Sequence, residues 1–114
     1  MALPILLVLG MQTVMASAKA AVQDTIVINK NQASKKYKVR LYPNATHEVL
    51  FFTAAGEEDK IYQLFLFDME SNLIKQTMVR NRQTSFLSRF AKGEYLYEVF
   101  SNDERIENGS VSIK

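Results

Sequence analysis

The sequence predicts an all-β fold, an antiparallel β-sandwich of seven to eight strands. Runs rich in β-branched and aromatic residues recur at short intervals, and clusters of Asn, Asp, Ser and Gly separate them. Gly tolerates positive φ, and Asn, Asp and Ser bond their own backbone, so these clusters favour turns over strand pairing. Closely spaced strands joined by turns are typical of a sandwich rather than of a helical fold.

Eight runs have the composition of a strand. We expect them at residues 25–29, 36–41, 48–53, 61–68, 73–79, 84–86, 95–101 and 105–113. The connection at residues 102–104 is short enough for a hairpin that joins the last two strands. The apolar run at residues 64–67 predicts a central strand covered on both faces, with two Leu facing one way and two Phe the other.

Strand alternation in the last strand, residues 105–113, places Ile106 on the opposite face from Val111 and Ile113. All three are large apolar side chains that belong in the core. One extra residue in the strand would reverse the alternation, and Gly often marks such a position. We therefore expect a β-bulge near Gly109.

One domain is expected, because the chain has 114 residues and room for a single core. We divide it into a signal peptide at residues 1–20, an N-terminal arm with the first strands at residues 21–40, and a β-sandwich region at residues 41–114. The formal charge of +2 is too small to indicate a nucleic-acid partner. The absence of Cys favours a bacterial exported protein, and it excludes a lipid anchor at the cleavage point.

Residues 1–20 have the features of a removable secretion signal. A Leu-rich block without charge is followed by small residues, and the triplets that end at Ala18 and Ala20 both fit the Ala-x-Ala pattern of signal peptidase sites. A membrane helix is the alternative, but polar residues interrupt the block, which falls short of the ~20 apolar residues of a span. We expect cleavage after Ala20, a mature chain that begins at Ala21, and no stable membrane span after cleavage.

The residue types that carry most enzyme chemistry are scarce. His47 is the single His and there is no Cys, so a Cys nucleophile and the common zinc patterns are excluded. The position of His47 after a Pro-Asn turn favours a solvated strand edge over a catalytic triad. The acidic cluster at residues 57–59 lacks the spacing of a calcium loop, and no Gly-rich phosphate loop is present. We expect no catalytic residue, no metal and no cofactor.

Two surface features are compatible with binding. Lys36, Lys38 and Arg40 alternate along one strand and predict a positive stripe, which Arg80 and Arg82 would extend. Protection of an edge strand by Lys is the alternative. Most Phe and Tyr residues belong in the core of a sandwich of this size, but two or three exposed ones would suffice for a patch that binds a sugar or a protein.

A longer pattern runs through residues 41–114. In order it contains Leu41-Tyr42-Pro43-Asn44, Val49-Leu50-Phe51-Phe52, Leu66-Phe67-Asp68, Leu73-Ile74-Lys75, Phe90-Ala91-Lys92-Gly93-Glu94-Tyr95-Leu96-Tyr97 and Gly109-Ser110-Val111-Ser112-Ile113-Lys114. This pattern resembles the type A C-terminal sorting domain of the Bacteroidetes type IX secretion system. The chain departs from the usual family pattern at Ala45, Ser71 and Ser110, where the family has Pro, Gly and Lys.

The resemblance implies an immunoglobulin-like sandwich that other proteins recognise. Such a domain reaches the periplasm by the general route, and the outer-membrane translocation machinery then recognises it. The recognition residues implied here are Gly93, Tyr95, Gly109, Ser110, Val111, Ile113 and Lys114. The implied partners are therefore proteins of the secretion machinery, and the implied location is the periplasm, the outer-membrane surface or the extracellular space.

The family attaches this domain to a cargo, whereas only residues 21–40 separate the expected signal peptide from the sorting-like region. The chain would then be a free-standing short relative, a remnant of a longer gene, or a member of a short secreted family of the same fold. The alternative function is a small secreted or periplasmic immunoglobulin-like binding module with its ligand on an aromatic or basic face.

Overall fold

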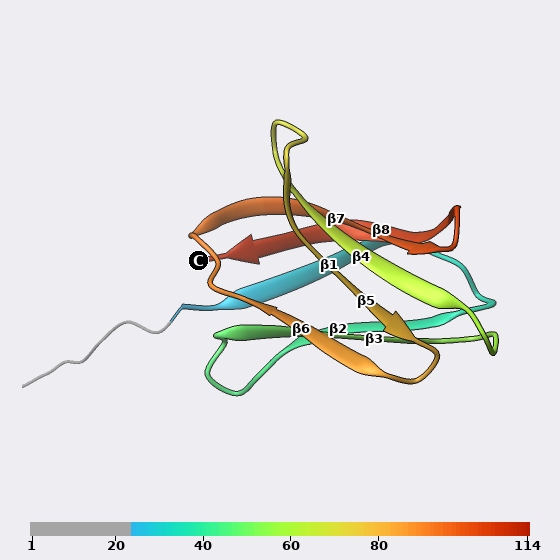
Figure 1. The fold of residues 1–114 in the computed structure, drawn as a ribbon. Helices are drawn as coiled ribbons and strands as arrows, with labels where there is room; N and C mark the ends of the chain where they lie inside the picture. The colour runs from blue at the N-terminus through green and yellow to red at the C-terminus, as the bar shows by residue number, and fades with distance from the viewer. Residues whose placement is uncertain (1–23) are drawn as a thin grey trace, which may run out of the picture.

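The computed structural model describes residues 24–114, which form two stacked antiparallel β-sheets (Figure 1). The expected cleavage residues Ala18, Ala20 and Ala21 lie outside this range. Eight strands are present, in agreement with the sequence prediction. They are β1 (Ile26–Ala33), β2 (Lys38–Pro43), β3 (Val49–Ala55), β4 (Ile61–Asp68), β5 (Leu73–Arg80), β6 (Thr84–Ser88), β7 (Gly93–Ser101) and β8 (Glu104–Ile113).

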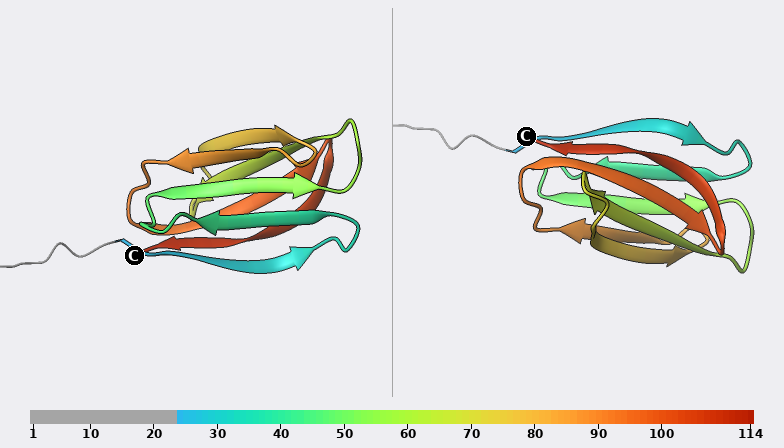
Figure 2. Two further views of the ribbon diagram at one scale, coloured as in Figure 1. Left: turned by 90° about the horizontal axis from the view of Figure 1, so that it is seen from below. Right: turned by 90° about the horizontal axis from the view of Figure 1, so that it is seen from above.

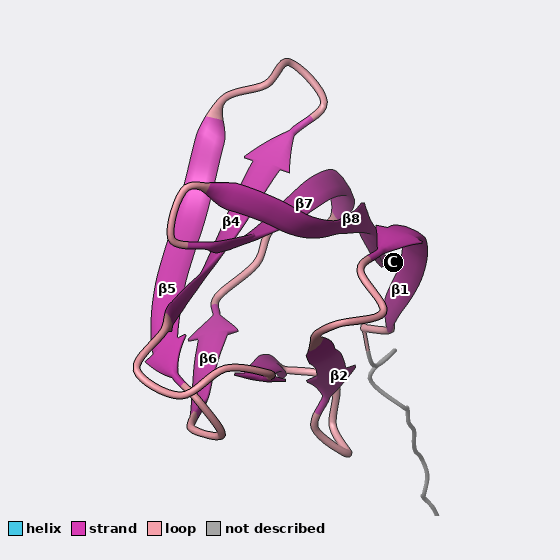
Figure 3. Ribbon diagram, turned by 90° about the vertical axis from the view of Figure 1, so that its right-hand side faces the viewer, coloured by secondary structure: helices cyan, strands magenta, loops and turns pink. Residues whose placement is uncertain are grey.

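The strands divide into a five-stranded sheet, in the order β1-β8-β7-β4-β5, and a three-stranded sheet, in the order β2-β3-β6. Strands β2 to β8 alone place three strands opposite four, as in immunoglobulin-like sandwiches, and β1 adds a fifth strand beside β8. Viewed from the side, β5 runs from one layer towards the other (Figure 3), where the hydroxyls of Thr77 and Ser85 join it to β6. No helix in residues 24–114 is long and apolar enough to cross a membrane.

The core lies between the two sheets and follows from strand alternation. Every second residue of β3 is buried, and the same holds for residues 62–66 of β4 and residues 95–101 of β7. The fully buried large side chains are Tyr62, Tyr97, Phe52, Leu50, Leu64, Leu66, Val99 and Val111. These side chains interdigitate from both layers, so each sheet depends on the other for its stability.

The prediction that β4 is a central strand covered on both faces is half right. β4 is a central strand, between β7 and β5, and its Leu64 and Leu66 are fully buried. Phe65 and Phe67 on the other face are only half-buried, because no layer within residues 24–114 covers that face. The apolar run therefore correctly predicted a central strand, but its prediction of a second covering layer was wrong.

The predicted bulge exists, but its position near Gly109 is wrong. Val99 pairs with Glu107 and Phe100 pairs with Arg105, so Ile106 is the extra residue of β8. The bulge turns Ile106 into the core, where 4% of its surface is exposed. Gly109 instead lies where the backbones of β1 and β8 and the Tyr97 ring come into close contact. The alternation of inward and outward residues in β8 continues through Gly109.

The first described residues belong to the same sandwich as the rest of the chain. β1 pairs with β8 along most of its length, and Thr25 and Lys114 exchange two backbone hydrogen bonds of 2.9 Å. Figure 1 shows the C-terminus beside the start of β1. The predicted hairpin between β7 and β8 is confirmed, since Ser101 pairs with Glu104 across a two-residue turn.

Gly109→Ala should destabilise the domain by roughly 1–3 kcal/mol, because its Cβ would lie 2.2 Å from the Asn29 carbonyl oxygen and 2.5 Å from the Tyr97 ring. Ser110→Ala, one residue away on the opposite face, should change the free energy of unfolding by less than about 0.5 kcal/mol. Urea unfolding followed by circular dichroism measures both. Equal stability of the two variants would show that the backbone at Gly109 relaxes to admit a side chain.

Candidate functional site

The predicted recognition residues come together on two neighbouring strands. Gly93 and Tyr95 of β7 pair with Ile113 and Val111 of β8. Tyr95, Val111 and Ile113 expose 7%, 0% and 4% of their surface, and Gly109 is also buried. A partner that met the folded domain would contact Gly93, Ser110 and Lys114, and would find the other four residues inside the sandwich.

The Gly-x-Tyr motif at the start of β7 has a structural basis. Gly93 has a φ of 147°, a backbone conformation that favours Gly. Tyr95 points inward, and its hydroxyl donates a 2.6 Å hydrogen bond to the carbonyl of Ala91. The motif thus stabilises the backbone conformation with which the chain enters β7.

A buried polar network, which the sequence analysis missed, lies beside Gly109. The Tyr97 hydroxyl donates a 2.8 Å hydrogen bond to Glu107, and the other carboxylate oxygen of Glu107 lies 3.3 Å from Lys30 Nζ. Burial, followed by the hydrogen bond and the charge of Glu107, raises the pKa of the Tyr97 hydroxyl above its usual value. A Tyr at an inward-facing position needs a hydrogen-bond partner for its hydroxyl. The alternation of β7, which directs Tyr97 inward, was therefore the sequence signal that could have predicted this network.

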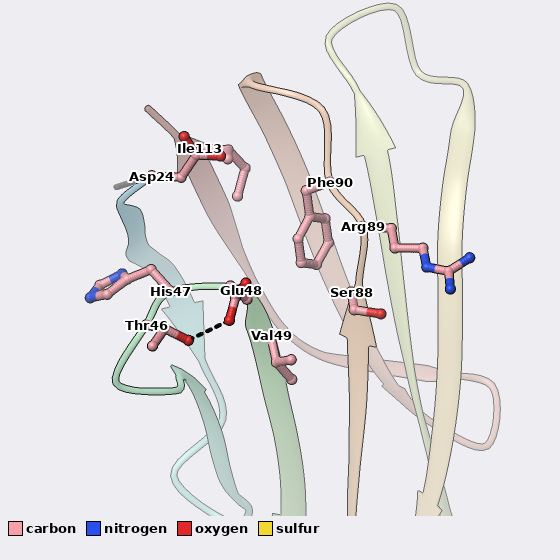
Figure 4. Close-up of a pocket in the computed structure, with 9 residues that line it drawn as sticks. All are labelled: Asp24, Thr46, His47, Glu48, Val49, Ser88, Arg89, Phe90 and Ile113. Atoms are coloured by element: carbon pink, nitrogen blue, oxygen red, sulfur yellow. Dashed lines mark hydrogen bonds between the residues drawn. The ribbon is translucent and has the colours of Figure 1, made fainter. Parts of the chain in front are cut away.

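An open cleft of about 750 Å³ contains His47 and Glu48 on one side and Ser88 and Arg89 on the other. His47 Nδ1 accepts a 2.9 Å hydrogen bond from the Ile26 backbone N–H, so a neutral ring carries its proton on Nε2. Catalytic His in a Ser-His-Asp triad has the opposite arrangement, with a free Nε2 acceptor. Figure 4 shows His47 and Arg89 pointing away from each other at opposite ends of the cleft.

The acidic cluster at residues 57–59 is engaged in local contacts. Glu57 accepts a 2.7 Å hydrogen bond from the Tyr37 hydroxyl and lies 3.2 Å from Lys36 Nζ. These contacts hold the pKa of Glu57 below its usual value, with the Tyr37 bond the largest cause. Among the residues that the structure describes, no three His, Cys, Asp or Glu side chains are placed to hold a metal ion.

The five-stranded sheet has an exposed apolar outer face, which we call the Phe65 patch. It consists of Phe65, Phe67, Leu73, Leu96 and Phe100, which come from β4, β5 and β7. The Phe65 ring lies 5.7 Å from Phe100 and 6.4 Å from Phe67, and Leu73 and Leu96 expose 50% and 38% of their surface. A groove of about 430 Å³ crosses the patch.

Polar groups surround the Phe65 patch. Glu98 lies between the apolar side chains and pairs with Arg105 of β8 at 3.0 Å. Asn102 and Asp103 of the β7–β8 turn line one end of the groove. An apolar centre with a polar rim is the arrangement of protein-binding surfaces.

The three-stranded sheet also has an aromatic outer face, which we call the Tyr42 row. Tyr42 of β2 pairs with Phe51 of β3, and Phe51 pairs with Phe86 of β6. The three rings therefore cross the sheet in one line, with the Tyr42 and Phe51 centroids 5.3 Å apart. Phe86 exposes 58% of its surface. Viewed from below, this face of the sheet is uncovered (Figure 2, left).

The predicted positive stripe is divided by the fold. Lys38 and Arg40 lie on the outer face of β2, next to the Tyr42 row, and β2 is an edge strand. Lys36 precedes β2 and pairs with Glu57 instead. The turn that contains Arg82 lies beside β3, since the Arg82 backbone N–H donates a 2.8 Å hydrogen bond to Ala54. Both sequence interpretations, edge protection and a positive surface, fit Lys38 and Arg40.

Comparison of the chain with family models, curated proteins and solved structures finds no match.

Tyr97→Phe should change the response of stability to alkali. Below about pH 10 the Tyr97 hydroxyl is protonated in both the folded and the unfolded state. Above about pH 10 the unfolded state loses this proton first, because the pKa is raised in the folded state. The free energy of unfolding therefore falls as pH rises, by about 1.4 kcal/mol per pH unit. The variant lacks this contribution, and its free energy of unfolding should fall less steeply between pH 10 and 11. Parallel profiles would show that Tyr97 titrates alike in both states.

Proposed function

We propose that the chain is an exported, non-enzymatic recognition domain, a sorting handle of the type IX kind, which the secretion machinery binds in its folded form. The observation that supports this best is the Phe65 patch. It is a contiguous aromatic and aliphatic surface with a polar rim, on the sheet that contains the C-terminal strand β8. A protein partner is the occupant that suits such a surface.

Recognition of the folded domain follows from the burial of the C-terminal strand. β8 is hydrogen-bonded to β1 on one side and to β7 on the other. Val111 and Ile113 are core residues, so pulling β8 out would cost the stability of the whole sandwich. A partner that reads this region therefore reads a surface composed of outward-facing side chains.

A non-enzymatic role is supported by the way the domain uses its polar residues. His47 fastens the β2–β3 turn to β1, and Glu57 and Glu107 accept hydrogen bonds from Tyr hydroxyls. Each of these groups stabilises the fold through these hydrogen bonds. The same residues would otherwise have been the first candidates for acid, base or ligand roles.

A second candidate function is a secreted binding module, which the Tyr42 row favours. This surface lies on the other sheet, is aromatic and carries positive charge from Lys38 and Arg40. The two functions are compatible, because the two faces lie on opposite sides of the sandwich.

The sorting proposal predicts that a double variant, Leu73→Gln with Leu96→Gln, blocks export without unfolding the domain. Both side chains are at least one-third exposed, so the substitutions should alter the surface and leave the core intact. A fluorescent protein inserted before residue 21 reports location in a host with a type IX system, and the unfolding midpoint reports folding. The variant should accumulate in the periplasm, while wild type and the control Phe86→Gln reach the cell surface or medium.

Export of the double variant at the wild-type level would rule out the Phe65 patch as the docking surface. Retention of the wild-type fusion in the periplasm would overturn the sorting function itself. Mass spectrometry of the mature ends tests cleavage after Ala20 in the same samples.

A further inference from the structure

The Tyr42 row is a flat surface built from three adjacent strands. Because Tyr42, Phe51 and Phe86 are directly paired across the sheet, they lie on the same outer face. A second row runs beside it, since Arg40 pairs with Thr53 and Thr53 with Thr84. The first row offers an aromatic surface, and the second offers the Arg40 cation and the Thr84 hydroxyl, since the Thr53 hydroxyl donates to the Gln83 carbonyl.

The charge on this face has one sign. The outward residues of β2, β3 and β6 include Lys38 and Arg40 and no Asp or Glu. Neither cation forms an ion pair with a carboxylate within residues 24–114, whereas Lys30, Lys36, Lys92 and Arg105 each do. An exposed apolar face with uncompensated positive charge suits a ligand that is both apolar on one side and anionic.

Arg40 is held in place for such a ligand. Its guanidinium lies over the Tyr42 ring, 4.7 Å from the centroid, and this cation–π contact fixes an otherwise flexible side chain. The guanidinium keeps its planar set of N–H donors, which match a carboxylate in a bidentate pair. The aromatic row and the anion-binding group are thus adjacent and ordered relative to each other.

We propose that the Tyr42 row binds an acidic polysaccharide. Sugar rings place C–H groups on their faces and hydroxyls at their edges, so a ring can stack on Phe51 or Phe86 while its edge reaches the polar row. The Tyr42 and Phe51 rings lie 5.3 Å apart and pack against each other, so Phe86 is the most exposed ring of the row. Carboxylates on the chain pair with Arg40 and Lys38. This inference names the ligand class of the second candidate function and is independent of the sorting proposal.

A second copy of the chain is disfavoured as the occupant in a twofold arrangement. A twofold pairing with its axis beside Arg40 and Lys38 would bring them against the same residues of the other copy, and like charges oppose association. Single-stranded nucleic acid shares the need for stacking and positive charge. The +2 formal charge of the whole chain and its expected export favour a glycan.

The test measures binding of the purified mature chain, from Ala21, to polygalacturonate by isothermal titration calorimetry. The wild-type domain should bind, with an affinity that falls as salt is raised, and should not bind the fully methyl-esterified polymer. Arg40→Gln and Phe86→Ala should each weaken binding by roughly five- to tenfold. Both side chains are exposed, so unfolding midpoints should stay unchanged.

Two matched controls test whether binding depends on the Tyr42 row itself or on any positive charge or apolar side chain at the surface. Arg89→Gln removes the same charge from an exposed position outside the row, and Met69→Ala removes an exposed apolar side chain outside both patches; both should bind as wild type does. Equal weakening by Arg40→Gln and Arg89→Gln would overturn the proposal, as would no binding of polygalacturonate. Tighter binding of oligothymidylate than of polygalacturonate would assign the row to nucleic acid instead. None of these results depends on export.

Discussion

The sandwich depends on a close contact at Gly109, where β1, β8 and the Tyr97 ring meet. The absence of a side chain lets the Tyr97 ring pack directly over the β8 backbone and lets the Asn29 carbonyl approach from β1. From that position the Tyr97 hydroxyl reaches Glu107, which Lys30 also neutralises. If the ring were displaced, a buried carboxylate would lose its hydrogen bond, and an unsatisfied buried charge is far more costly than a lost surface contact.

The same contact determines what the outer faces display. Tyr97 is directed inward, so strand alternation directs Leu96 and Glu98 outward on β7, and cross-strand pairing then aligns them with Phe67 and Phe65 on β4. The large sheet consequently carries an apolar patch with acidic neighbours, whereas the small sheet carries aromatic rings with cations. Ring pairs on these faces contribute to sheet stability, and the exposed parts of both faces are the surfaces on which our binding proposals rest.

The sequence predicted most of the fold because local pattern decides it. β4 begins and ends where its apolar run does, and the two-residue turn after Ser101 forms the expected hairpin. The bulge was misplaced because two physical roles of Gly look alike in a sequence: a bulge position and a point of close backbone approach. Only the close approach of the Tyr97 ring and the Asn29 carbonyl distinguishes them, and both contacts are non-local.

The candidate surfaces were harder to predict, since they depend on register between distant strands. Tyr42, Phe51 and Phe86 form one row because β3 pairs with both β2 and β6 in a particular register. A shift of one residue in either pairing would turn an aromatic side chain to the core. The sequence contains seven Phe and five Tyr, two or three of which would suffice for a patch, but it does not show which of them share an exposed face.

The departures from the sorting-domain pattern can be judged by where the fold places them. Ser110 pairs with Leu96 and Asn29, and its side chain is on the outer face of the large sheet. Replacing the family's Lys by Ser there removes a charge beside the Phe65 patch and leaves the core unchanged. At Gly109, one residue earlier, a larger residue would clash with the Asn29 carbonyl and the Tyr97 ring. Gly109 is therefore a position that the fold requires, whereas Ser110 lies on the surface that our sorting proposal assigns to a partner.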